Sequence, residues 1–352
     1  MSVELLTELQ GAHAFESVPS RQEMADFHVP FDNLTGTAGC ETAAVGALYR
    51  GERVALVGPT GAGKSSVIAS VLGPLVEGLA PLPIPVSTAP EAMSDGSAFV
   101  RHVVATVGRW VSLSQPQAAA RAGALAKRGA GRPATNRSVA LHVAPQWVVD
   151  GMKQGVELGA ELRSATAAEM RTPDEVFDIA REILQIVRDG GHEPVLVLDD
   201  TDRWTNISQG NTRAYRDMFF GTIIRTIAEE LRVPMVVAVH PTYLQDPAYL
   251  AAAGGFLDTT IAVPRLPSSA GIGLMLARRA ALALDLDADR EPTLVHEIIE
   301  QNALDQLFQH YATHDHSVRA VIRVAHASLT AAADEGADLI TEGHVRAELE
   351  MG

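Results

Sequence analysis

The chain has 352 residues, of which 47% are hydrophobic and 20% charged, and its formal net charge is -15. This length suits a core of about 200 to 250 residues plus a smaller unit, and the composition excludes a chain that is disordered throughout. The negative charge excludes a surface that is basic everywhere, so any contact with nucleic acid has to come from a local patch.

Targeting features and the single cysteine indicate the cellular location and the state of the thiol. The sequence has no long uncharged apolar run and no basic, apolar signal at its N-terminus, which predicts a soluble, cytoplasmic protein that does not contact membranes. Its only cysteine, Cys40, is expected to be a buried or inert thiol.

The first elements in chain order precede and surround a glycine-rich turn. Apolar spacing predicts a short helix at residues 3–9, an extended stretch at 27–31, a helix at 41–49, a strand at 54–57, a helix after 65, a strand at 81–86 and a helix at 96–110. The strand at 54–57 and the helix after it enclose the turn G-P-T-G-A-G-K-S at residues 58–65.

That turn fits the pattern G-x-x-x-x-G-K-[ST] in the strand–turn–helix setting that phosphate binding requires. Its glycines allow backbone N–H groups to converge on phosphate, and the helix N-terminus adds a partial positive charge. Lys64 is expected to reach the β- and γ-phosphates, Ser65 to ligate Mg²⁺ and Ser66 to touch the α-phosphate. The predicted nucleotide-binding residues are Gly58, Pro59, Thr60, Gly61, Ala62, Gly63, Lys64, Ser65 and Ser66.

The segment 112–171 is alanine-rich and is predicted to be an irregular insertion. It carries a group of basic residues with no acid between the first and the last of them: Arg121, Lys127, Arg128, Arg132 and Arg137. One hypothesis is a mobile loop that contacts DNA phosphates through residues 121–137. The alternative is a solvated loop whose charge keeps the protein soluble.

A helix at 173–187 and a buried strand V-L-V-L lead to two acids. We expect Asp199 to hold Mg²⁺ together with Ser65, and Asp200 to act as the base or to position the attacking water, although these two roles can be exchanged. The alternative is that these acids, with Asp202, only cap a following helix.

The remaining elements predict a parallel sheet covered on both faces, followed by helices alone. A helix at 212–231, a strand at 235–240 that ends at His240 and a strand at 258–263 complete the alternation of strands and helices. After residue 267 we predict helices at 269–284, 292–312, 316–333 and 341–350. The predicted domains are an N-terminal segment 1–50 that packs near the nucleotide site, a core 51–267 with the insertion 112–171, and a helical unit 268–352.

Three stretches together resemble AAA+ ATPases, within the initiator-like group of origin-recognition, helicase-loading and transposition-regulator ATPases. They are A-L-V-G-P-T-G-A-G-K-S-S, V-L-V-L-D-D-T-D-R-W and S-V-R-A-V-I-R-V-A-H-A-S-L. The resemblance implies an α/β P-loop NTPase core, a small all-helical C-terminal lid, and ATP with Mg²⁺ as ligands. It also implies that Arg319 in the lid faces the γ-phosphate and that His240 occupies the sensor 1 position. Histidine is unusual there, and the alternative for His240 is a strand-end side chain bonded to the backbone.

The sequence departs from this family at the arginine finger. In the family, a neighbouring subunit usually donates an arginine from just before the last core strand. The stretch A-A-A-G-G-F-L-D-T-T before the last core strand has no arginine, and the possible substitutes are Arg203, Arg213, Arg216, Arg225 and Arg265. The run D-D-T-D-R-W also resembles the D-D-x-D-R of KAP and STAND-type signalling NTPases. His310, His314 and His316 beside Asp315 have spacing suited to a metal, but we expect a surface cluster without one.

These observations predict an ATP-binding and ATP-hydrolysing switch. By resemblance, it assembles with copies of itself on DNA and recruits or regulates a partner protein. The alternative is a STAND-type signalling or defence ATPase that controls an effector without DNA. A small-molecule kinase is disfavoured, because a compact kinase rarely carries a helical C-terminal unit with an arginine such as Arg319.

Overall fold

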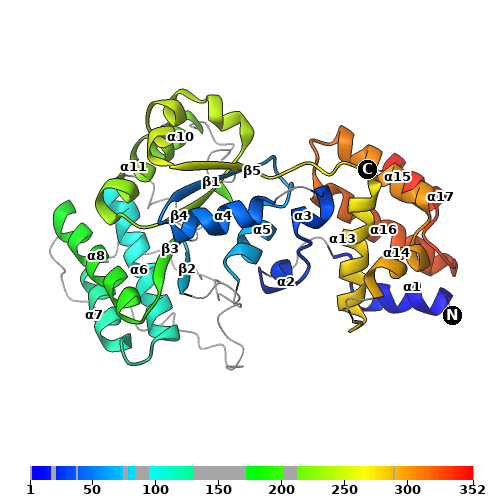
Figure 1. Cartoon of the computed structure of the whole chain (residues 1–352), viewed down its shortest axis with the longest axis horizontal. Coiled ribbons are helices and arrows are strands. Elements are labelled where there is room, and N and C mark those ends of the chain that lie inside the picture. The colour runs from blue at the N-terminus through cyan, green and yellow to red at the C-terminus, as the bar shows by residue number, and fades with distance from the viewer. Residues whose placement is uncertain are drawn as a thin grey trace. The chain divides into compact units, whose positions relative to one another are not determined.

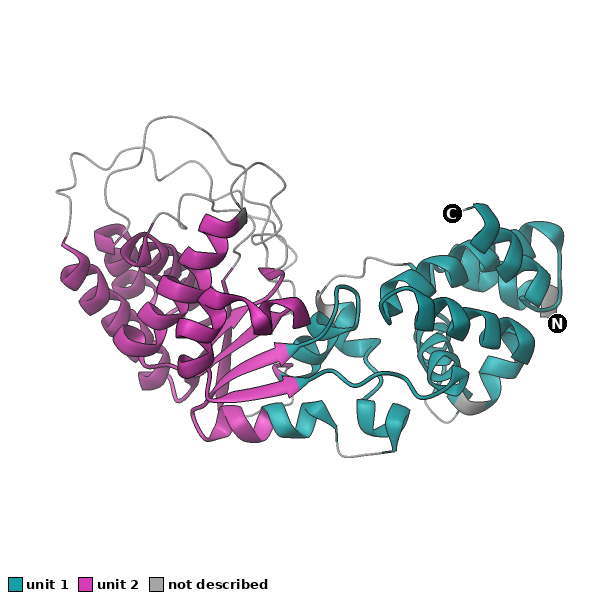
Figure 2. Cartoon of the chain, turned by 90° about the horizontal axis from the view of Figure 1, so that it is seen from above, with its two compact units in different colours: residues 1–44, 57–71, 262–352 teal, residues 45–56, 72–261 magenta. Residues whose placement is uncertain are grey.

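The computed structural model describes residues 2–16, 21–36, 39–73, 78–84, 95–129, 172–201, 212–287 and 290–351. Its contacts divide the chain into two compact units, coloured separately in Figure 2. The first unit contains residues 1–44, 57–71 and 262–352, and the second contains 45–56 and 72–261. The glycine-rich turn therefore belongs to the same unit as the C-terminal helices.

The second unit is built on a five-stranded parallel sheet with the strand order β2-β3-β4-β1-β5. The register pairs Leu79 with Glu193 between β2 and β3, and Leu196 with Met235 between β3 and β4. Every residue of β4 is buried, and because successive side chains point to opposite faces, both faces of the sheet are covered there. The predicted α/β class is confirmed, and the strands are β1 (Arg53–Val57), β2 (Leu79–Pro83), β3 (Glu193–Leu198), β4 (Met235–Val239) and β5 (Thr259–Ala262).

Three helices of this unit pack against one another beside β2 and β3 (Figure 1). They are α6 (Gly96–Ser114), α7 (Ala119–Gly129) and α8 (Pro173–Asp189). The expectation of irregular structure was wrong for Ala119–Gly129. Ala122, Leu125 and Gly129 form one buried face of α7, and a Cβ placed on Gly108 of α6 would lie 2.7 Å from Ala126 Cβ, so small residues allow the two helices to approach closely.

The predicted helix at 212–231 is present and contains two wider π turns. It consists of α10 (Thr212–Met218), η4 (Phe219–Ile223), α11 (Ile224–Thr226) and η5 (Ile227–Leu231), and it ends where Arg232 adopts a left-handed conformation with φ of 52°. After β4, the connection to β5 contains η6 (Pro241–Gln245), η7 (Tyr249–Ala253) and α12 (Gly254–Phe256).

The first unit combines N-terminal helices, the helix after the glycine-rich turn and the C-terminal helices. Its elements are α1 (Ser2–Gly11), α2 (Arg21–Asp26), α3 (Phe31–Thr35), the start of α4 (Cys40–Tyr49), α5 (Lys64–Val71), α13 (Ser269–Ala283), α14 (Glu291–Ile298), α15 (Gln301–Thr313), α16 (Val318–Glu335) and α17 (Glu342–Met351). Helix α1 packs on α16, α2 on α5, and α3 on α13. The short helices α2 and α3 are additions to the predicted elements.

One predicted helix, at 292–312, is in fact two. The chain leaves the helical conformation at Ile299, which forms a parallel β-bridge with Ile340. The Glu300 N–H donates to Ile340 O at 3.0 Å, and the Ile340 N–H donates to Ile298 O at 2.8 Å. This pairing with a distant residue uses the backbone groups that a continuous helix would need. No helix in the described part of the chain is both long and apolar enough to cross a membrane.

Candidate functional site

The glycine-rich turn leaves β1 and enters α5, which begins at Lys64. Gly61 and Gly63 have φ angles of 82° and 102°, a region that glycine adopts without the steric cost of a Cβ. The Lys64 side chain is buried, and its Nζ donates hydrogen bonds to Gly58 O at 2.6 Å and Pro59 O at 3.0 Å. The turn is therefore curled around its own ammonium group.

This arrangement has the chemistry of an anion site. The first N–H groups of any helix lack acceptors within that helix, and the helix dipole places partial positive charge at the same end. Lys64 adds a full charge, and phosphate oxygens would replace neutral carbonyls as its acceptors. The turn is also tightly enclosed, because a Cβ on Gly58 would lie 3.3 Å from Val263 Cβ.

The N-terminal end of α16 lies against the turn. The Arg319 backbone N–H donates to Gly61 O at 3.2 Å, and a Cβ on Gly61 would lie only 2.2 Å from Ser317 Oγ. The Ser317 hydroxyl accepts a hydrogen bond from Ala320 N–H at 3.2 Å and so caps the helix. Arg319 is exposed, and its guanidinium has no hydrogen-bond or ion-pair partner among the residues that the structure describes. The structure thus brings the backbone of Arg319 to the loop.

Ser66, on the first turn of α5, contacts the N-terminal segment through its side chain. Its Oγ lies 2.8 Å from His28 Nδ1 and 3.4 Å from Met24 O. To touch a phosphate, this hydroxyl would have to leave His28. The sequence offered no signal for His28, because a single histidine outside any motif can have many environments.

The two acids after β3 differ in their surroundings. Asp199 is 8% exposed, whereas Asp200 is exposed and has a left-handed φ of 56°. The Asp200 N–H donates to Asp199 Oδ1 at 2.8 Å. Next to them, the buried Thr201 hydroxyl donates to Ala238 O and ties the end of β3 to the end of β4. Sequence reasoning missed Thr201, and Asp202 lies outside the described residues.

His240 follows β4 and caps the short helix η6. Its Nδ1 accepts hydrogen bonds from the Thr242 hydroxyl at 2.8 Å and from the Thr242 N–H at 3.4 Å. Because Nδ1 is an acceptor, the ring proton is on Nε2, which makes Nε2 a hydrogen-bond donor. Nδ1 of His240 is therefore bonded locally, as the alternative interpretation expected. The Nε2–H group is suited to donate to an anionic oxygen or a water.

The predicted site residues form two groups. Lys64, Ser65, Ser66 and Arg319 are in the first unit, and Asp199, Asp200 and His240 are in the second. Strand β1 lies next to β4, which lies next to β3. Because parallel strands end at the same edge of a sheet, the carboxyl end of β1 lies at the edge where β3 and β4 end, next to the acids and His240.

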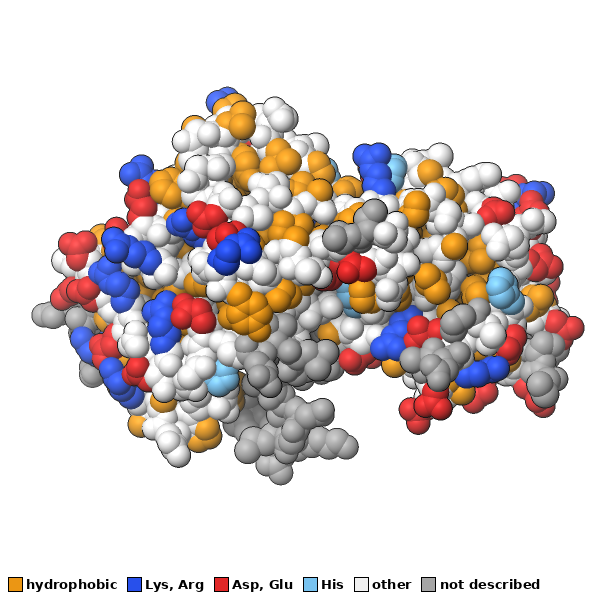
Figure 3. Space-filling view, viewed as in Figure 1, with side chains coloured by type: hydrophobic (Ala, Val, Ile, Leu, Met, Phe, Trp, Pro, Cys, Tyr) orange, Lys and Arg blue, Asp and Glu red, His pale blue; other side chains and the backbone are white. Residues whose placement is uncertain are grey.

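The other predicted residues are scattered. Arg121 Nη2 lies 3.2 Å from Glu182 Oε1, and Arg132 and Arg137 fall outside the described residues. Figure 3 shows acidic and basic side chains interspersed over the end of the molecule formed by α6, α7 and α8. On the face drawn, this end of the molecule shows no patch made of basic side chains alone.

The substitute arginines have mixed environments. Arg216 pairs with Asp246 at 3.0 Å, Arg225 with Glu229 at 3.0 Å, and Arg213 lies 3.9 Å from Asp217. Arg265 has no ion-pair partner in the described chain, and Arg203 is outside it.

The histidine cluster lies at the end of α15. The rings of His310 and His314 are 3.9 Å apart, and burial together with the nearby His314 lowers the pKa of His310. Among the described residues, no group of three or more His, Cys, Asp or Glu side chains has a geometry that could hold a metal ion.

No model of a known protein family matches this sequence, and no curated protein matches it either. A functional assignment therefore depends on the motif, the sheet order and the contacts of individual side chains.

Proposed function

We propose that this protein binds Mg-ATP at residues 58–66 and hydrolyses it, as an AAA+-type P-loop ATPase. The observation that supports this most is the complete phosphate-binding motif in the setting that its chemistry requires. The turn leaves an inner strand of a parallel sheet, passes through left-handed Gly61 and Gly63, and enters α5 with the buried Lys64.

The residues suggest a division of roles. Lys64 binds the β- and γ-phosphates, while the Ser65 hydroxyl and the Asp199 carboxylate supply the hard oxygen donors that Mg²⁺ prefers. The exposed Asp200 orients the attacking water or accepts its proton.

Two donors complete the proposed arrangement around the γ-phosphate. The His240 Nε2–H donates to the phosphate or to the attacking water. Arg319, whose guanidinium has no partner in the described chain, contacts the γ-phosphate from the start of α16.

We propose that ATP binding and hydrolysis control a switch, in which the protein self-assembles and regulates a partner protein. The DNA-bound form of this proposal relies on residues 121–137. The Arg121–Glu182 pair and the acids interspersed around α7 favour the second candidate, a STAND-type signalling ATPase that acts without DNA. Light scattering after size exclusion distinguishes them, since assembly with an ATP analogue alone supports signalling and assembly only with duplex DNA supports the DNA-bound switch.

The ATPase proposal is tested with Lys64→Ala. The substitution removes the only side-chain ammonium of the turn, so we expect Mg-ATP affinity to fall by about 10-fold to 100-fold, the range of one charge-assisted hydrogen bond. Calorimetric titration measures the affinity, and Lys127→Ala, on the exposed face of α7, is the matched control. Wild-type affinity in Lys64→Ala would refute the assigned site.

A further inference from the structure

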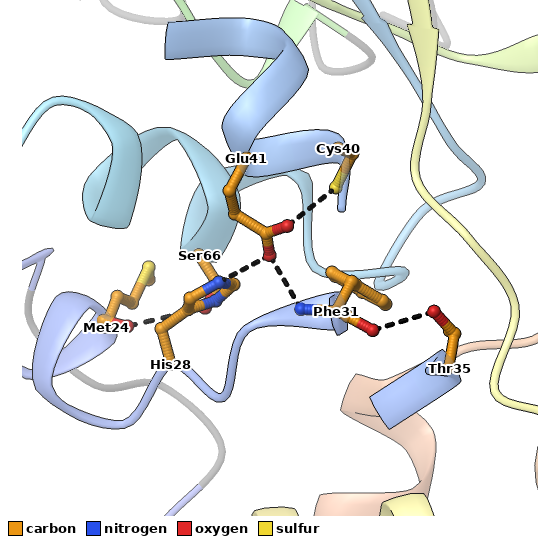
Figure 4. A network of polar contacts seen from close by, with 7 residues as sticks. All are labelled: Met24, His28, Phe31, Thr35, Cys40, Glu41 and Ser66. Atoms are coloured by element: carbon orange, nitrogen blue, oxygen red, sulfur yellow. Dashed lines mark hydrogen bonds and ion pairs between the residues drawn. The ribbon is translucent and has the colours of Figure 1, made fainter. Parts of the chain in front are cut away.

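A chain of hydrogen bonds connects the phosphate-binding helix to the N-terminal segment (Figure 4). The Ser66 Oγ and His28 Nδ1 are 2.8 Å apart, and His28 Nε2 and Glu41 Oε1 are 2.8 Å apart. The Phe31 N–H also donates to Glu41 Oε1, at 2.9 Å. The side chains of His28 and Glu41 are only 4% and 13% exposed, so these contacts are made away from water.

The Glu41 carboxylate fixes the direction of the hydrogen bonds that it receives. Burial raises the pKa of Glu41, but hydrogen bonds from His28 and from the Phe31 N–H outweigh it and leave that pKa below its usual value. The ionised Glu41 only accepts, so His28 donates to it from Nε2. The other ring nitrogen, Nδ1, faces the Ser66 hydroxyl.

The residues just before His28 are held by α13. Arg279 Cζ lies 4.6 Å from the centre of the Phe27 ring, and Arg279 also donates to Glu16 O at 2.9 Å. The neighbouring Arg278 donates to Asp26 O at 3.0 Å. A continuous set of contacts thus runs within the first unit from Ser66 through His28 and Phe27 to α13.

We propose that His28 is a positioning residue that couples the Ser66 hydroxyl to helix α13, so that phosphate at the loop changes the hold of α13 on residues 26–28. This inference builds on the proposed function, since the phosphate belongs to the bound nucleotide. A phosphate oxygen only accepts hydrogen bonds, so Ser66 must turn away from His28 to donate to it. His28 then loses a partner in a buried site, which costs free energy unless the segment moves.

The burial of His28 also decides between two interpretations of this chain. A hydroxyl, an imidazole and a carboxylate in series can activate a nucleophile. However, the His28 side chain is 4% exposed, which leaves no room for a substrate at Nδ1. The Ser66 hydroxyl therefore has two positions, one at His28 and one at a bound phosphate. A group with two discrete positions of this kind can couple distant sites.

Amide hydrogen exchange tests the coupling, with and without Mg-ATP. In the wild type we expect Mg-ATP to slow exchange both in residues 64–70 and in residues 276–283 of α13. In His28→Ala and in Arg279→Ala, the first effect should remain and the second should fall by about 10-fold, within the usual range for coupled sites. Arg279→Ala removes the contacts of α13 with Phe27 and Glu16 and leaves the phosphate-binding residues unchanged. His192→Ala is the control, because the ring is exposed and its one hydrogen bond within the described residues is with Gly190 O.

The outcomes separate the two proposals. Slowing in α13 that persists in both variants overturns the inference, as does wild-type binding without any response of α13. Absence of Mg-ATP binding by the wild type, measured by calorimetry, overturns the proposed function and the inference together. If His28→Ala does not fold, Arg279→Ala decides alone, because it leaves the hydrogen bonds of His28 with Ser66 and Glu41 in place.

Discussion

Asp199 and Asp200 are adjacent residues whose carboxylates have different environments. The left-handed φ of 56° at Asp200 turns the chain sharply, so that Asp199 is buried while Asp200 is exposed. A non-glycine residue in this conformation is uncommon and costs free energy, and such residues cluster at functional sites. This difference supports a metal role for Asp199 and a catalytic role for Asp200.

Asp200→Asn should therefore retain Mg-ATP binding and lose turnover. The amide keeps the shape of the side chain but cannot accept a proton, so we expect kcat to fall by about 100-fold or more. Phosphate release measures kcat, and calorimetry measures binding. The exposed Asp189, changed to Asn, is the matched control. Loss of binding together with turnover would exchange the roles of the two acids, and unchanged turnover would exclude Asp200.

Helix α16 begins at the turn, and its first residues set how closely the two approach. Gly61 accepts the Arg319 N–H and leaves no space for a Cβ beside Ser317. The exposed Arg319 and Arg323 are one helical turn apart, but only Arg319 makes this contact. A guanidinium held there can distinguish ATP from ADP, since only ATP has a γ-phosphate.

Arg319→Ala should lower the ratio of ATP to ADP affinity by about 10-fold, the value of one hydrogen bond to a charged group. Titration with an ATP analogue and with ADP gives the ratio. Arg323→Ala is the matched control, because it removes the same charge one turn further from the loop. A ratio that stays unchanged in Arg319→Ala would assign this residue to the surface.

Helix α7 limits how DNA contact could arise. A phosphate has to compete with Glu182 for Arg121, although both side chains are exposed and their pair is weak. Lys127 is exposed in the last turn of the same helix.

We therefore expect Lys127→Ala to flatten the dependence of log affinity on log salt by about 0.9, and Arg121→Ala to flatten it by less. Binding of duplex DNA at several salt concentrations measures both slopes, with Arg346→Ala in α17 as the control. Equal effects of the two substitutions would contradict this order. If the wild type does not bind DNA at low salt, with or without ATP, the signalling ATPase becomes the favoured proposal.

The stability of the folded protein should depend on Glu41. Its pKa is below the ordinary value of 4.5, so the stabilisation is present above that value and is lost as pH falls through the lower folded pKa. Glu41→Gln should lower the free energy of unfolding by about 1–3 kcal/mol near neutral pH, because the charged acceptor of His28 is removed. Thermal unfolding should show this difference shrinking as pH falls below 4.5. A difference that is constant with pH would refute the role of the charge.

Local patterns were sufficient for most of the fold. The sequence predicted five strands, and their alternation with helices predicted a parallel sheet. The apolar runs are clearest in β1, β3 and β4, which are buried along almost their whole length. The left-handed turn at Gly61 and Gly63 was also predictable from the local sequence, because glycine adopts positive φ without the steric cost of a Cβ. The partners of His28 were not predictable, because Glu41 and Ser66 lie 13 and 38 positions away.

The sequence alone determined the phosphate-binding motif, the acids that end β3, the position of His240 and the helical character of the C-terminal part, because these depend on spacing within one element. Tertiary structure decided where neighbouring elements compete or assist. The bridge between Ile299 and Ile340 breaks a helix that periodicity favours, and packing against α6 and α8 makes a helix of Ala119–Gly129. His28 became a residue of interest only when folding brought Glu41 and Ser66 to its two ring nitrogens, since hydrogen bonds between distant segments leave no periodic pattern in the sequence.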